Sequence, residues 1–178
     1  MPVPLMILVI IIAVVLFWII SVKNNFTRLD IKISEALAGI EVALEKRYDM
    51  LNKLLDVTKS YMKHETETLE KVISLRKGMA LDELVSADNK LNELNSNLVA
   101  YAENYPELRS SEVFVELQKG IIEAEEHLQA ARRLYNANVT AYNTAIAVFP
   151  DKLLANGLRP RAFYEVENYK KSDVDVNL

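Results

Sequence analysis

The feature that most constrains this chain is its N-terminal stretch, because residues 1–22 carry no charged side chain. From residue 3 onward the stretch reads VPLMILVIIIAVVLFWIISV. A helix needs about 20 apolar residues to cross a hydrocarbon core of roughly 30 Å. The stretch also lacks the basic start and the small-residue cleavage site of a removable signal peptide. We therefore predict a retained transmembrane anchor over residues 1–22.

The charges that flank this anchor predict its orientation. Lys23, Arg28 and Lys32 follow the apolar stretch, whereas no basic side chain precedes it. Basic residues close to a membrane span stay on the cytoplasmic side. We therefore expect a short N-terminus outside the cell and the rest of the protein in the cytoplasm.

The remainder of the chain has the pattern of an all-α protein. Only 4 of the 178 residues are glycine and 5 are proline. The chain therefore has few of the residues that form the many tight turns of a β-rich fold. Apolar residues recur at helical spacing over residues 26–55, 81–104 and 114–149, and Pro106 and Pro150 end the second and third segments. We predict an N-terminal transmembrane helix followed by an antiparallel bundle of three long helices. A short fourth helix over residues 151–156 and an irregular tail over residues 158–178 complete the prediction.

The first of these segments carries an apolar stripe with an eleven-residue period, or about 3.67 residues per turn. Its membrane-proximal members are Phe26, Leu29, Ile33, Leu37, Ile40, Leu44, Tyr48 and Leu51. The second helix is roughly 36 Å long, so from a turn near Gly78 it would reach back only to about Asn52. We therefore predict that residues 26–51 form an uncovered stalk that associates with identical copies of the chain.

The motifs of common enzymes are not found in this sequence. The two histidines, His64 and His127, stand in neither H-E-x-x-H nor E-x-x-H, and the four isolated glycines form no phosphate or dinucleotide loop. The sequence contains no cysteine and no G-x-S-x-G motif. Its net charge of -4 gives no general attraction to nucleic acid. We expect no catalysis, no metal, no cofactor and no nucleic-acid partner.

Polar side chains on or beside the apolar stripes predict a hydrogen-bonded network between the helices. Its predicted members are Arg47, Asp49, His64, Glu65, Glu103, Glu125, Arg132, Asn136 and Asn143. Buried charges must be paired, which favours a network that fixes the register of the helices. We expect Arg132 to pair with Glu125 or Glu103. The alternative is a ligand site around Arg132 and Tyr135.

Several short motifs resemble the LemA family of bacterial membrane proteins. They are LEKRYDML at residues 44–51, YMKHE at 61–65 and ENYPEL at 103–108, followed by Tyr142-Asn143 and Phe149-Pro150. The resemblance covers roughly residues 26–166 together with the anchor. The family commonly has Ile-Pro-Asn-Leu where this chain has Leu51-Asn52-Lys53-Leu54, so a proline kink in the first helix is not expected here.

The resemblance implies a single-pass protein of the bacterial cell membrane with a helical soluble domain and no settled reaction. Some LemA-like proteins are looked for together with membrane-bound zinc metallopeptidases, which suggests that they act as scaffolds or adaptors. We expect an anchor over residues 1–22, a helical bundle over 23–157 and a tail over 158–178. The expected function is a self-associating scaffold in contact with membrane lipid. The alternative is a sensor or accessory subunit that binds a ligand or peptide and regulates a membrane enzyme, such as a membrane-bound metallopeptidase.

Overall fold

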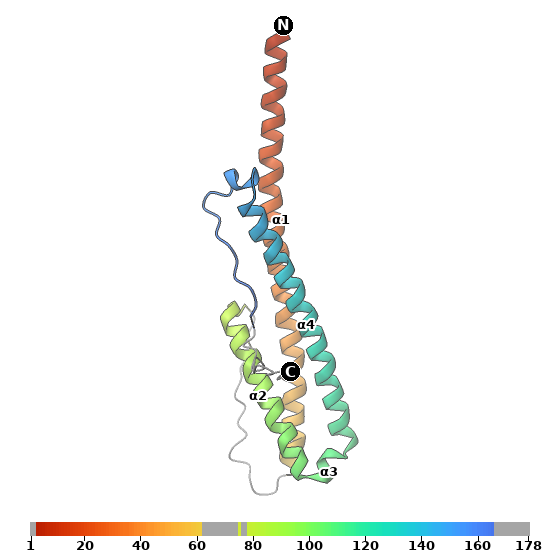
Figure 1. Ribbon diagram of the computed structural model, residues 1–178. Helices are drawn as coiled ribbons and strands as arrows, with labels where there is room; N and C mark the ends of the chain where they lie inside the picture. Colours follow the sequence, from red (N-terminus) through yellow and green to blue (C-terminus); the bar gives the residue numbers. More distant parts are fainter. Residues whose placement is uncertain (1–2, 62–74, 76–77, 166–178) are drawn as a thin grey trace, which may run out of the picture. The chain divides into compact units, whose positions relative to one another are not determined.

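The computed structural model describes residues 3–61, 75 and 78–165, and every regular element in this part of the chain is helical (Figure 1). The elements are α1 (Val3–Tyr61), α2 (Leu81–Asn104), α3 (Pro106–Arg109), α4 (Glu112–Ala147) and the 3-10 helix η2 (Asp151–Leu154). The predicted all-α class is confirmed. The apolar N-terminal stretch and the amphipathic segment that follows it are parts of the single helix α1, which has 59 residues.

The chain divides into two compact units. The first unit is formed by the described parts of residues 1–38 and 131–163, and the second by those of residues 39–130 and 164–178. Because α1 and α4 are long, each of them contributes to both units.

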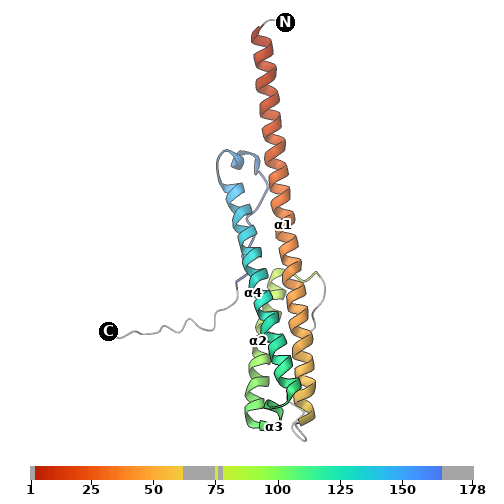
Figure 2. The same ribbon diagram turned by 90° about the vertical axis from the view of Figure 1, so that its right-hand side faces the viewer.

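In the first unit, residues 22–38 of α1 lie beside the end of α4, and the residues of α1 before them extend beyond it (Figures 1 and 2). The core contains Val22, Phe26 and Ile33 from α1, and α4 contributes Tyr135, Val139, Tyr142 and Ile146 at spacings of three and four residues. The amide of Asn138 donates a hydrogen bond of 3.0 Å to the backbone carbonyl of Lys32. Before this packed region, α1 contains a window with a mean hydropathy of 3.3 that is long and apolar enough to cross a membrane.

The second unit contains residues 39–61 of α1 together with α2, α3 and the first half of α4. Leucines form most of its core, because they recur every three or four residues on the inner faces of the helices. The completely buried ones include Leu44, Leu51, Leu54, Leu55, Leu91, Leu98, Leu108 and Leu128. In this unit α2 points in the same direction as α1, and α4 points in the opposite direction (Figures 1 and 2).

Local sequence explains where these helices begin and end. The carboxylate of Glu83 accepts a hydrogen bond of 2.9 Å from the backbone N–H of Ala80 at the start of α2. Pro106 ends α2 and occupies the first position of α3, where its missing N–H is tolerated. The hydroxyl of Ser111 accepts a bond of 3.2 Å from the N–H of Phe114, which caps α4.

The course of the second helix differs from the antiparallel course that we predicted. The 19 residues between Tyr61 and Leu81 can span roughly 60 Å when extended, which exceeds the roughly 36 Å length of α2. The connection is therefore long enough for α2 to run parallel to α1, with Asp88 in its second turn beside Arg47. Since α2 ends at the distal end of the second unit, α4 returns along α1.

This return of α4 covers the apolar stripe of α1. In the first unit Phe26 and Ile33 are buried, and in the second unit Ile40, Leu44 and Leu51 are buried. Leu29, Leu37 and Tyr48 are half-buried. The prediction that no helix of the chain covers residues 26–51 is therefore wrong, and the stripe belongs to the core.

Candidate functional site: a buried arginine cluster

The second unit holds a buried guanidinium at Arg47, whose side chain is only 4% exposed. Its Nη1 lies 3.1 Å from Oδ1 of Asp88 and 2.8 Å from Oε2 of Glu125. Its Nη2 donates a hydrogen bond of 2.6 Å to Oδ1 of Asn92. One side chain of α1 thus binds two residues of α2 and one residue of α4.

Asp88 is completely buried, and it is the second centre of the cluster. While its Oδ1 faces Arg47, its Oδ2 accepts a hydrogen bond of 3.1 Å from the hydroxyl of Tyr164. This hydroxyl also lies 3.4 Å from the carbonyl oxygen of Leu84. Tyr164 is itself buried, so its hydrogen bond holds the segment around residue 164 against α2.

In this cluster one guanidinium pairs with two carboxylates that differ in their exposure to solvent. The Asp88 side chain has no exposed surface, whereas the Glu125 side chain is 28% exposed. Water therefore screens the Glu125 pair more strongly than the Asp88 pair. A buried ion pair is costly to desolvate and much costlier to break, so the arrangement favours a single register of α1, α2 and α4.

The structure brings Arg47 and Glu125 of the predicted network together and adds Asp88, Asn92 and Tyr164. Asp88 could have been found from the sequence, because it occupies the apolar face of α2 between Leu84 and Leu91. Tyr164 could not, since it follows α4 and η2 in a segment without helical periodicity.

The other predicted members lie elsewhere. Asp49 and Glu103 are exposed, and Arg132 and Asn136 are half-buried in the first unit. Asn143 contributes to a separate polar contact in that unit. His64 and Glu65 lie outside the described residues.

This separate contact is centred on Arg161. The Asn143 side chain accepts a bond of 2.8 Å from the N–H of Arg161 and donates one of 3.0 Å to its carbonyl. The guanidinium of Arg161 binds Asp30 Oδ1 through Nη2 at 2.6 Å and Nε at 3.0 Å, and it lies 6.0 Å from the centroid of the Tyr142 ring. Residue 161 is thereby fastened to both helices of the first unit.

Tyr135 fastens the neighbouring residue, because its hydroxyl donates a hydrogen bond of 3.1 Å to the carbonyl of Ala162. Burial raises the pKa of Tyr135 above its ordinary value of 10.0, and the positive charge of Arg161 opposes part of this shift. The hydrogen bond to Asp30 is the main cause that raises the pKa of Arg161.

The polar side chains around Arg47 and Arg161 form hydrogen bonds and ion pairs between different segments of the same chain. In the part of the chain that the structure describes, no group of three or more Asp, Glu or His side chains is placed to hold a metal ion.

The fold and its polar contacts define an all-helical protein with one N-terminal helix that is apolar enough to span a membrane. The LemA family pattern matches residues 36–178, which are most of the chain, so this protein belongs to the LemA family. The family resemblance predicted from the sequence is confirmed.

Two curated proteins illustrate the relationship. The chain is 26% identical over 162 residues to Protein LemA of Metamycoplasma hominis, an alignment that covers 87% of this chain and 74% of that protein. It is also 28% identical over 72 residues to Magnetosome protein MamQ of Magnetospirillum gryphiswaldense, which covers 40% of this chain and 26% of MamQ.

Proposed function

We propose that this protein is a membrane-anchored helical scaffold that self-associates and performs no catalysis of its own. The observation that carries the proposal is the continuity of α1, because the apolar stretch and the amphipathic segment belong to one uninterrupted helix. A continuous helix transmits the position and orientation of the anchor to the residues that follow it. Such an arrangement suits a protein that holds a helical surface at the membrane.

The polar clusters support this proposal because their charged groups bind other residues of the same chain. Arg47 is directed to Asp88, Asn92 and Glu125 of its own chain. Buried ion pairs of this kind fix helix packing. They favour a rigid platform over a reactive site.

Self-association requires a surface other than the buried stripe. In the first unit, Ile31 is 53% exposed although Ile33, two residues later, is only 5% exposed. Residues two apart on a helix lie on different faces, so Ile31 is on the outer side of α1. Copies anchored in one membrane meet at a raised effective concentration, and we propose that they contact one another through this outer side.

Disulfide crosslinking in native membranes tests this proposal, because the chain contains no cysteine of its own. We expect Ile31→Cys to give covalent dimers on mild oxidation. Ile33→Cys is the matched control and should give none, since this side chain is buried in the single chain. If Ile31→Cys remains monomeric and a different protein copurifies in a fixed ratio, the scaffold proposal fails.

That outcome would support the alternative of a sensor or accessory subunit that regulates a membrane enzyme. The ligand site for this alternative was expected around Arg132 and Tyr135. The Tyr135 hydroxyl, however, already donates a hydrogen bond to the carbonyl oxygen of Ala162. A ligand that accepts a hydrogen bond from this hydroxyl would have to displace the chain's own carbonyl, which favours the scaffold.

A further inference from the structure

The turn that follows α4 in the first unit carries a group of exposed apolar side chains. Val148 is 52% exposed, Phe149 76% and Leu153 66%, and we call these three residues the apolar turn. They lie at and just before η2. Single apolar side chains are common on protein surfaces, whereas several in one short segment indicate contact with something other than water. The level of the turn along α1 indicates what it contacts.

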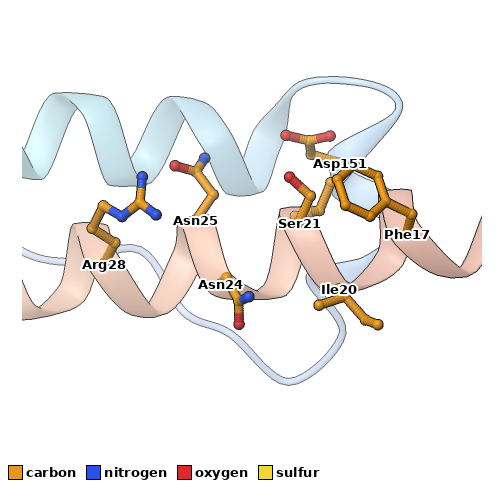
Figure 3. A pocket seen from close by; sticks show the side chains of 8 residues that line it. Phe17, Ile20, Ser21, Asn24, Asn25, Arg28 and Asp151 are labelled. Atoms are coloured by element: carbon orange, nitrogen blue, oxygen red, sulfur yellow. The ribbon is translucent and has the colours of Figure 1, made fainter.

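Asp151, in the middle of the apolar turn, fixes this level. It lines a pocket of about 360 Å³ together with Phe17, Ile20 and Ser21 of α1, and its carboxylate lies close to Ser21 and Phe17 (Figure 3). Beyond this level, α1 continues toward its N-terminus without a neighbour among the described residues of the first unit (Figures 1 and 2). The apolar turn therefore lies beside the last residues of the uncharged stretch.

The same level is the expected boundary of the hydrocarbon layer. A helix that enters the hydrocarbon near Val3 needs about 20 residues to cross it, so it leaves the hydrocarbon near Val22. Trp18 lies about one helical turn before that point, and tryptophan is enriched where acyl chains meet headgroups. The end of the span and the apolar turn thus occupy the same layer.

The two charged residues of the turn are compatible with this layer. The carboxylate of Asp151 is directed toward α1 (Figure 3), where the pocket also has the polar side chains of Asn24 and Arg28 in its lining. Lys152 is exposed, and a lysine at such a boundary keeps its ammonium group among the headgroups while its methylene groups cover apolar surface. Neither charge has to enter the acyl chains.

From these observations, we propose that the apolar turn inserts into the leaflet from which α1 emerges and gives the protein a second contact with the membrane. Val148, Phe149 and Leu153 replace their contact with water by contact with the outer ends of the acyl chains, which stabilises the inserted state. Lipid is already present at this level, so no second protein is needed to cover the turn. A single span can rotate about its axis and tilt, whereas a second contact beside the axis restricts both motions.

A fluorophore on the turn tests its insertion, and the absence of cysteine from the chain allows labelling at one position. The full chain carrying Phe149→Cys is labelled with nitrobenzoxadiazole and reconstituted in phosphatidylcholine vesicles. These contain lipids with a nitroxide, a quencher, either near the headgroup or near the end of an acyl chain. We expect emission at shorter wavelengths than in water and stronger quenching by the shallow nitroxide than by the deep one.

Val113→Cys is the matched control, because Val113 is also exposed and apolar but lies at the other end of α4, in the second unit. Its label should emit as in water and be quenched little by either nitroxide.

A second substitution tests whether the apolar side chains cause the insertion. Leu153→Asp, introduced into the labelled Phe149→Cys chain, should return the emission toward its value in water and remove most of the quenching by the shallow nitroxide. Ile122→Asp makes the same change at an exposed site of α4 in the second unit and should leave both signals unchanged.

Several results would overturn the proposal. They are emission as in water at Phe149→Cys, stronger quenching by the deep nitroxide, or signals that Leu153→Asp does not change. Emission at short wavelengths that neither nitroxide quenches would mean that protein, rather than lipid, covers the turn.

Trp18, the only tryptophan of the chain, separates these failures from a failure of the anchor. In the unlabelled chain its fluorescence should be quenched by the same nitroxide lipids. Absence of this quenching would show that α1 is not inserted, and the proposal, which depends on the anchor, would fail with it. Neither measurement depends on self-association.

Discussion

At the scale of single residues, the stability of the second unit depends on the pairing of Arg47 with Asp88. Arg47→Ala would leave the Asp88 carboxylate buried without its cation. Breaking a buried ion pair on one side typically costs about 3–5 kcal/mol. We expect denaturant unfolding of the detergent-solubilised full chain, followed by circular dichroism, to report a loss of this size.

The neighbouring residue supplies the control for this prediction. Lys46 is exposed on the same turn of α1, and Lys46→Ala should change the free energy of unfolding by less than about 1 kcal/mol. Similar losses for Lys46→Ala and Arg47→Ala would contradict a special role for the buried pair.

Tyr135 makes stability depend on alkaline pH. Its pKa is raised in the folded state above the ordinary value of 10.0, mainly by burial. Below about pH 10 the phenol is protonated in both states, and its contribution to stability is complete. Above that pH the unfolded chain loses the proton first, so the free energy of unfolding decreases as pH rises toward the folded-state pKa.

Tyr135→Phe removes this titration. The free-energy difference between wild type and variant should be constant from neutral pH to about pH 9 and should shrink above about pH 10. Unfolding curves recorded in a series of alkaline buffers measure this difference. A difference that stays constant at every pH would show that the phenol does not titrate differently in the two states.

The residues of the Arg47 cluster show what a sequence can reveal about such a site. Arg47 and Glu125 were recognised because polar residues beside an apolar stripe are unusual, and Asp88 obeys the same rule. The pairing itself was not predictable, because it depends on which helices are neighbours. Tyr164 lacked any periodic signal, because it follows α4 and η2 in a segment without helical structure.

At the scale of helices, two glycines should respond in opposite ways to the same substitution. Gly39 lies within α1 with nothing within 4 Å of the position that a Cβ would occupy. Alanine is favoured over glycine in a helix by about 0.8–1.0 kcal/mol. We expect Gly39→Ala to raise the thermal unfolding midpoint by about 2–4 °C, as measured by circular dichroism.

Gly157 has the same open surroundings but a φ of +86°, a backbone conformation that alanine adopts only at a cost. Gly157→Ala should lower the midpoint, because the left-handed conformation costs a residue with a Cβ about 1–2 kcal/mol. Shifts of the same sign for both variants would show that φ at Gly157 does not decide the outcome.

The helices themselves were predictable to a large extent. The predicted segment over residues 81–104 agrees with α2. Pro106 lies at its boundary, because proline has no N–H for a helical hydrogen bond. The direction of α2 was not predictable from periodicity, because an amphipathic stripe fixes the buried face and leaves the direction open. The length of the connection before Leu81 was the relevant signal.

At the scale of the whole molecule, the proposed scaffold depends on the side of the membrane that the helical domain occupies. We propose the cytoplasmic side, because Lys23, Arg28 and Lys32 follow the apolar stretch. Basic residues within about 15–20 residues of a span set its orientation more strongly than acidic ones.

The absence of cysteine from the sequence allows a direct test of this orientation. Ser110 lies on the exposed turn between α3 and α4, so Ser110→Cys introduces an accessible thiol with little effect on packing. In intact cells this thiol should resist a membrane-impermeant maleimide, and permeabilisation should allow rapid labelling. The unreactive wild-type chain is the background control. Labelling of Ser110→Cys in intact cells would place the helical domain outside, and the scaffold would then have to act on extracellular partners.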